Sequence, residues 1–210
     1  TVWKGSGRLV LIDVNSRTEG LRTMPGVAVP GRLDWTVSKL PLLLGIVDAD
    51  MRLAGMTQPV RLSGGLSEMR ISAGQVSLPS VDLGRLGSPW NTIKPAGALA
   101  LRWEEMVLRE GSFNGKANIE LSNMASALTP VNPLGSYRIN VEGEGDSAKL
   151  DIVTINGPLR LDGDGTWTAR RGVQFTAFAV AEEREQARLR TLLGLIGRRQ
   201  GNKTLIKIGA

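Results

Sequence analysis

The stretch from Asn132 to Trp167, NPLGSYRINVEGEGDSAKLDIVTINGPLRLDGDGTW, decides the fold. Apolar residues alternate with polar ones in three short runs, and Gly, Pro, Asn and Asp separate these runs. A period of two is typical of half-buried strands, and the separating residues are typical of turns. The first two runs flank the polar segment 142–146, which predicts a hairpin. Consecutive antiparallel strands are therefore expected here.

The rest of the chain has the same character. Its 210 residues include 26 Gly and 10 Pro, which leave little room for long helices. Consecutive short strands mostly pair with their neighbours in sequence. The predicted fold class is all-β: a meandering antiparallel sheet in two related halves with a short C-terminal helix. More than about 40% strand and less than about 20% helix are expected.

The two halves are predicted from landmarks that recur in the same order. Residues 1–90 form the first half, with landmarks in 31–87, and residues 91–210 form the second half. A hairpin within 123–156 is inserted in the second half, and both halves belong to one continuous domain. The repeated landmarks are Gly31-x-Leu33-x-Trp35 and Gly97-x-Leu99-x-Leu101-x-Trp103, Pro59–Gly64 and Pro158–Gly163, and Leu83–Gly87 and Leu193–Gly197.

One helix is predicted near 182–196. Acidic residues open this segment, which suits the positive end of the helix dipole. Leu189, Leu192, Leu193 and Ile196 form an apolar stripe at helical spacing, and Gly197 follows as a stop signal. The stripe favours a helix that covers the end of the sheet; a partner-binding helix is the alternative.

The residue types exclude most catalytic centres. The chain contains no His and no Cys, so the usual zinc sites, Ser–His–Asp triads and Cys–His pairs cannot form. No Ser stands three residues before a Lys, so the S-x-x-K signature is also missing. The sequence therefore predicts no catalytic residue, no cofactor-binding residue, no metal ligand and no enzyme.

Two acidic patterns invite a site but favour a structural role. Asp162-Gly-Asp164-Gly resembles the start of a calcium loop, but the twelfth position is Val173 instead of a carboxylate. The same residues favour a turn between Leu161 and Trp167. Asp48 and Asp50 lie on one face of a predicted strand, and a solvated strand face is the expected role.

Candidate partner-binding residues are Trp3, Trp90, Arg198 and Arg199. The two tryptophans stand beside Gly or Pro outside the alternating runs, which favours exposed contacts. The formal net charge is +6, and the two arginines belong to the basic end of the chain. No aromatic residue lies among these cations to stack on bases, so nucleic acid is not an expected partner. A solvated helix and tail is the plainer interpretation.

The chain also resembles a known family. The order NPLGSY, a strand pair and then GPLRLDGDG is similar to the C-terminal half of type II secretion system protein N. The similarity continues through PAGALALRW at 95–103 and LLGLIG at 192–197, so it is stronger in the second half.

This resemblance implies a non-enzymatic accessory of the bacterial machine that exports folded proteins. The implied role is to link the inner-membrane platform to the outer-membrane secretin from the periplasm. The implied partners are the periplasmic domains of the secretin and the inner-membrane assembly-platform proteins. No membrane span and no signal peptide is predicted in the chain. The resemblance implies an N-terminal membrane anchor upstream of Thr1.

Two other functions stay open. Meandering sheets with one apolar face can curl into a groove for acyl chains, so a periplasmic lipid-handling module is the main alternative. A carbohydrate-binding domain would need exposed Trp side chains on one surface.

Overall fold

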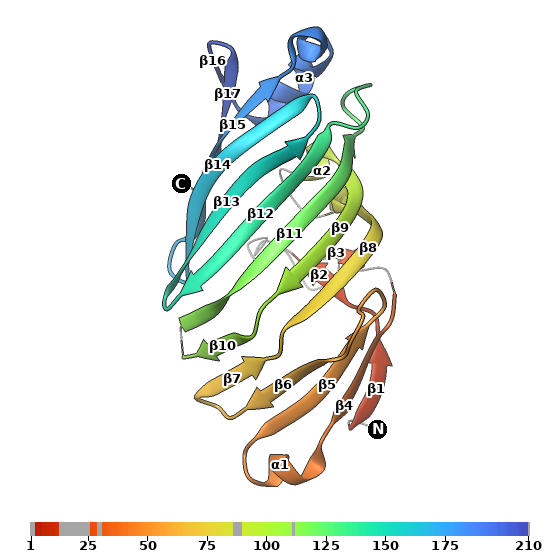
Figure 1. Cartoon of the computed structure of the whole chain (residues 1–210), viewed down its shortest axis with the longest axis vertical. Helices are drawn as coiled ribbons and strands as arrows, with labels where there is room; N and C mark the ends of the chain where they lie inside the picture. Colours follow the sequence, from red (N-terminus) through yellow and green to blue (C-terminus); the bar gives the residue numbers. More distant parts are fainter. Residues whose placement is uncertain (1–2, 13–25, 29–30, 86–89, 111, 210) are drawn as a thin grey trace, which may run out of the picture.

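The structure is an elongated antiparallel sheet whose strands run obliquely to the long axis (Figure 1). It is a computed structural model that describes residues 3–12, 26–28, 31–85, 90–110 and 112–209. Strands make up 63% of it and helices 13%, which confirms the all-β prediction. Fifteen of the described strands belong to one sheet.

The N-terminal end of the sheet is built from short strands that pair mostly in chain order. The sequence of neighbours is β1 (Lys4–Gly7), β4 (Leu33–Val37), β5 (Val47–Leu53), β6 (Val60–Gly64), β7 (Glu68–Ile71) and β10 (Met106–Arg109). A separate two-stranded sheet consists of β2 (Val10–Ile12) and β3 (Gly26–Ala28).

The C-terminal end continues from β10 into longer strands. These are β11 (Ser112–Ser126), β12 (Gly135–Glu144), β13 (Ser147–Asn156), β14 (Leu159–Thr168), β15 (Gly172–Ala181), β17 (Lys203–Ile208) and β16 (Arg198–Gln200), in spatial order. The long strand β11 also pairs with β9 (Pro95–Trp103), which in turn pairs with β8 (Gly74–Asp82). The sheet therefore branches where the two ends meet.

The predicted DGDG turn is wrong, because β14 runs straight through it. Gly163 and Gly165 face Ala177 and Phe175 on β15. A Cβ atom on Gly163 would collide with the side chain and backbone of Ala177. Glycine is needed here because the two strands approach closely, and no change of direction occurs.

The helices are few and short. The predicted C-terminal helix is confirmed: a 3₁₀ turn, η2 (Glu183–Glu185), leads into α3 (Gln186–Ile196), and Gly197 follows as the cap. Two short helices, α1 (Lys39–Leu43) and α2 (Trp90–Ile93), were not predicted from the sequence. A further 3₁₀ turn, η1 (Leu83–Arg85), follows β8.

The helix α3 covers the end of the sheet, as the leucine stripe predicted. Leu189 and Leu192 are fully buried, and Leu193 and Ile196 pack beside them. We call this group the α3 cluster; its buried members are Val131, Leu134, Leu159, Ala179, Ala181, Leu189 and Leu192. A second group, the β8 cluster, comprises the buried residues Leu53, Val76, Leu78 and Val81.

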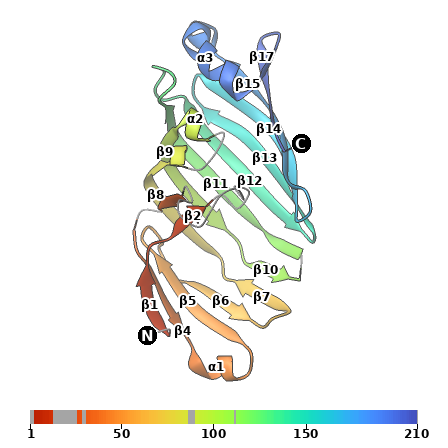
Figure 2. The ribbon, with the colours of Figure 1, turned by 180° about the vertical axis from the view of Figure 1, so that it is seen from behind.

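Both clusters lie on the same face of the sheet, which we call the apolar face. Figure 2 shows α2 and β2 in front of this face. Between the clusters, register partners on successive strands form an apolar row of Val76, Leu101, Ile119, Ile139 and Ile152. The last four members of this row are half-buried. The opposite face carries polar residues, as the period of two requires.

Tryptophan covers glycine on the paired strand in both parts of the sheet. Trp35 on β4 lies over its register partner Gly5 on β1. Trp103 on β9 lies in the same way over Gly74 on β8. An aromatic ring that packs on a cross-strand glycine restores contacts that glycine lacks. The matching pairs support the predicted relation between the halves, which stays a prediction.

Candidate partner-binding surfaces

The four predicted partner-binding residues lie at three places in the fold. Trp3 directly precedes β1 at one end of the sheet, and Arg198 and Arg199 belong to β16 at the other end (Figure 1). Trp90 begins α2, and its side chain lies outside the described part of the chain. Trp3 therefore lies at the opposite end of the sheet from the two arginines, whereas α2 contacts α3, which in turn contacts β16. Each of the three places remains a separate candidate.

The two ends of the sheet are its first candidate surfaces. β1 pairs with β4 on one side and β16 pairs with β17 on one side; their other sides have no partner strand within the described ranges. An edge of this kind presents backbone N–H and C=O groups that an added strand can use. Ser6 in β1 and all three residues of β16 are exposed.

A basic groove of about 600 Å³ lies between α3 and the β16–β17 hairpin. Arg190, Arg199 and Lys203 line it together with Glu183. None of the three cations forms an ion pair with a carboxylate in the described part of the chain. The guanidinium Nε of Arg199 instead donates to the carbonyl oxygen of Gly201 at 3.0 Å. The groove therefore offers positive charge to an anionic partner.

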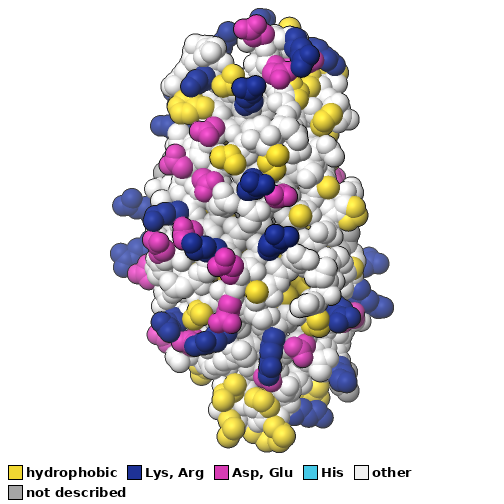
Figure 3. All heavy atoms as spheres, viewed as in Figure 1, with side chains coloured by type: hydrophobic (Ala, Val, Ile, Leu, Met, Phe, Trp, Pro, Cys, Tyr) yellow, Lys and Arg dark blue, Asp and Glu magenta, His cyan; other side chains and the backbone are white. Residues whose placement is uncertain are grey.

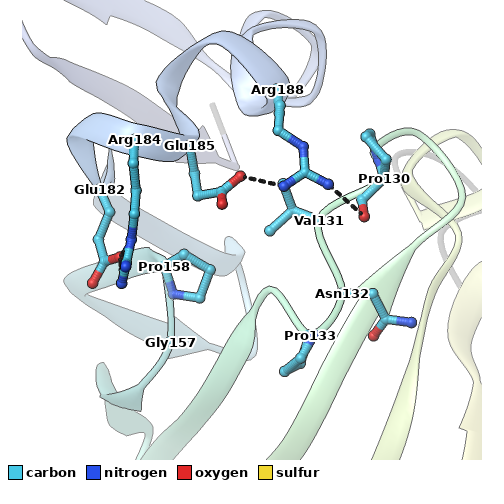
Figure 4. A pocket seen from close by; sticks show the side chains of 10 residues that line it. All are labelled: Pro130, Val131, Asn132, Pro133, Gly157, Pro158, Glu182, Arg184, Glu185 and Arg188. Carbon is cyan, nitrogen blue, oxygen red and sulfur yellow. Dashed lines mark hydrogen bonds and ion pairs between the residues drawn. The ribbon is translucent and has the colours of Figure 1, made fainter.

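A second hollow, of about 420 Å³, lies between η2, α3 and two loops of the sheet (Figure 4). Arg188 bridges its two sides: one nitrogen lies 2.8 Å from Glu185, and another donates to the carbonyl oxygen of Pro130 at 3.2 Å. Arg184 pairs with Glu182 at 2.9 Å. These charges are paired within the chain. The polar contacts that line the hollow hold α3 against the loop 127–134.

The polar face of the sheet is a network of paired side chains. Asn118 donates to Asn140, and Asn140 donates to Asp151, both at 2.7 Å. Lys116 and Glu142 form an ion pair across the neighbouring strands, which lowers the pKa of the carboxyl group and raises that of the ammonium group. Figure 3 shows Lys and Arg side chains intermingled with Asp and Glu side chains on this side. Mixed charge of this kind suits a solvated surface.

Two titratable groups with shifted pKa values, Asp48 and Tyr137, have structural roles. Asp48 accepts hydrogen bonds from Arg61 at 2.7 and 2.9 Å, and this pairing holds the pKa of the Asp48 carboxyl below its usual range. Burial raises the pKa of Tyr137, whose hydroxyl donates to the carbonyl oxygen of Leu159. No group of three or more acidic residues that could hold a metal ion occurs among the residues described.

The chain is therefore an all-β protein whose candidate binding surfaces are sheet edges and grooves. The family model described as "Type II secretion system (T2SS), protein N" matches residues 1–205, and the chain belongs to this family. The predicted resemblance is thereby confirmed, and it extends over both halves. No curated protein and no solved structure matches the chain.

Membership in this family makes the chain a component of the type II secretion system, which serves protein transport across the bacterial envelope. Within the described ranges, no helix combines the length and apolarity needed to cross a membrane.

Proposed function

We propose that this component is non-enzymatic and links the inner-membrane platform to the outer-membrane secretin. It works in the periplasm and is held at the inner membrane by a segment that precedes Thr1. The observation that carries the proposal is the single sheet with an edge at each end, because two edges allow two partners to be joined. The periplasmic domains of the secretin and the assembly-platform proteins are the proposed partners.

The backbone geometry of β1 shows which groups a partner strand would use. The N–H of Val37 donates to the carbonyl oxygen of Trp3, so this pair is hydrogen-bonded across β1 and β4. In an antiparallel ladder such pairs alternate with pairs whose groups point outward. Lys4 and Ser6 therefore direct their N–H and C=O groups away from β4. In β16 the corresponding residue is Arg199, because Gln200 and Lys203 close the hairpin.

Proline at an outward-facing position is expected to abolish binding at that edge. Ser6→Pro and Arg199→Pro each remove one outward N–H and leave the ladder to the neighbouring strand intact. We expect one of them to eliminate binding to isolated periplasmic domains of the secretin, as measured by calorimetry at about 100 μM, where contacts worth roughly 5 kcal/mol register.

The matched controls are Ser6→Ala and Arg199→Ala, which keep the backbone donor. Ser6→Ala should bind as the unchanged chain does. Far-UV spectra of the proline variants should match those of the controls. If the unchanged chain shows no affinity for secretin domains, or if both proline variants bind as well as their controls, linkage by strand pairing is refuted.

The basic end is expected to affect the rate of association more than its final extent. Replacing Arg198 and Arg199 by alanine should slow association severalfold at low salt, and the difference should shrink at high salt. Stopped-flow mixing at two salt concentrations measures this effect. Equal association rates for the variant and the unchanged chain would exclude a steering role.

The apolar face favours one other function, a lipid-handling module. Its apolar row continues beyond Ile152 through Gly163, Ala177 and Ile206, so no polar side chain interrupts this register line from β8 to β17. Such a face suits acyl chains. Phospholipid that co-purifies and is seen in native mass spectra would support this function, and an Ile139→Asp variant should then lose it.

A further inference from the structure

An exposed group of aliphatic side chains lies at the N-terminal end of the long axis. Leu40, Leu43 and Leu44 of α1 and its C-terminal cap are 77%, 84% and 79% exposed, Ile46 is 43% exposed, and Leu66 in the β6–β7 turn is fully exposed. We call these five residues the apolar tip. Figure 3 shows them as a gathering of hydrophobic side chains at the lower end of the molecule.

The local backbone holds these side chains outward. Pro41 accepts backbone hydrogen bonds from Leu44 and Ile46 at 2.9 Å each, so the turn is closed by its own groups. Gly45 ends the turn with a φ of +73°, a value that glycine adopts readily. α1 contains no buried residue. The leucines therefore point away from the protein because the turn is fixed, and they have no core to collapse onto.

The two parts of the apolar tip adjoin each other. Val47 at the start of β5 pairs with Gly64 at the end of β6, which brings the two turns side by side. A Cβ atom on Gly65 would lie 3.8 Å from the carbonyl oxygen of Gly45. The result is a convex, aliphatic projection made by two neighbouring turns.

The surroundings of the apolar tip identify the medium that it suits. Lys39 lies with its ammonium 5.6 Å from the ring centre of Trp3, and Lys4 follows in β1. Neither lysine has a carboxylate partner among the residues that the structure describes, while Asp48 nearby is neutralised by Arg61. The aliphatic side chains project farthest, and Trp and Lys lie behind them. This order matches a bilayer, in which aliphatic side chains enter the hydrocarbon, Trp lies at the interface and Lys contacts anionic headgroups. A protein interface would more often use a flatter patch rich in aromatic residues and arginine.

We propose that the apolar tip inserts into the headgroup and upper acyl region of an anionic phospholipid bilayer. This contact orients the molecule, because α3 and β16 lie at the opposite end of the sheet (Figure 1). The sheet then extends away from the bilayer and presents the basic groove at its far end. The proposal does not rest on linkage to the secretin, since it concerns the other end of the molecule.

Flotation with vesicles of phosphatidylethanolamine and phosphatidylglycerol tests the insertion. The full chain should float with these vesicles, and the double variant Leu43→Asp and Leu44→Asp should bind at least about tenfold more weakly, because charged side chains resist transfer into lipid. Leu195→Asp is the matched control: Leu195 is an exposed leucine on α3, at the other end of the sheet. This control should float like the unchanged chain.

A second measurement does not depend on loss of binding. The fluorescence of the tryptophan in Leu43→Trp, taken as the difference from the unchanged chain, should shift to the blue when vesicles are added and should be quenched by brominated lipid. Leu195→Trp should show neither effect. Failure of the unchanged chain to float, equal flotation of the double variant, or no lipid quenching at position 43 would each overturn the proposal. So would self-association through the tip that vesicles do not displace.

Discussion

Leu189→Ala is expected to lower the free energy of unfolding by about 3 to 5 kcal/mol, the upper part of the range for buried leucine. Leu189 is 0% exposed and sits at the centre of the α3 cluster, between α3 and the strands β14 and β15. The alanine would leave a cavity that the surrounding strands cannot fill, because the sheet ladder fixes their spacing. Urea unfolding followed by circular dichroism measures the loss.

The same helix provides the control for this prediction. Leu195 is 54% exposed, and Leu195→Ala should change stability by less than about 0.5 kcal/mol. A loss of similar size in both variants would mean that burial in the α3 cluster does not set the size of the effect, because alanine has at least the helix propensity of leucine. A loss below about 1 kcal/mol at Leu189 would mean that α3 is not part of the cooperative core.

Gly163→Ala is expected to cost about 3 kcal/mol, a large effect for the addition of one methyl group. The new Cβ would meet the Cα atom of Ala177 and the carbonyl oxygen of Thr176, and backbone atoms cannot move aside as a flexible side chain can. The strands β14 and β15 would have to separate in the middle of their ladder. Thermal unfolding should show a clearly lower midpoint.

The matched change Gly194→Ala should have the opposite sign. Gly194 lies within α3, and a Cβ atom there would meet nothing within 4 Å. Alanine at such a position should stabilise the chain by about 0.5 to 1 kcal/mol, because it has the higher helix propensity. If Gly163→Ala were as neutral or stabilising as Gly194→Ala, the close approach of β14 and β15 would be disproved.

The strands of the second half could be predicted because their alternation is regular. Tyr137, Ile139 and Val141 all lie on the apolar face of β12, as a period of two requires. The polar segment 142–146 predicted the hairpin correctly but not the position of its turn. β12 continues to Glu144, and the tight turn comes at Gly145 and Asp146. Glycine also occurs inside a strand where the partner strand approaches too closely for a side chain. The composition of the DGDG segment therefore predicted a turn where β14 continues.

The candidate surfaces were harder to predict. Trp3 and the arginines of β16 are exposed, but their role in partner binding stays a prediction. The apolar tip was not predicted from the sequence. Its exposure depends on how α1 and the β6–β7 turn project beyond the sheet, and no local pattern encodes that. Likewise, the hydrogen bond from Arg188 to the carbonyl oxygen of Pro130 joins residues 58 positions apart, so no local pattern predicts it.

The pairing of β11 to β15 in chain order also has a consequence for how the protein folds. From β12 to β15 each strand finds its partner across a short turn, and β11 reaches β12 through the loop 127–134, so the loop-closure entropy of each step is small. Folding can then advance strand by strand, each hairpin extending the last. Every intermediate in such a process ends in an open, growing edge, which is also where chains aggregate. The docking of α3 onto β14 and β15 is the last of these folding steps. We therefore expect this docking to be the step that stabilises the folded sheet.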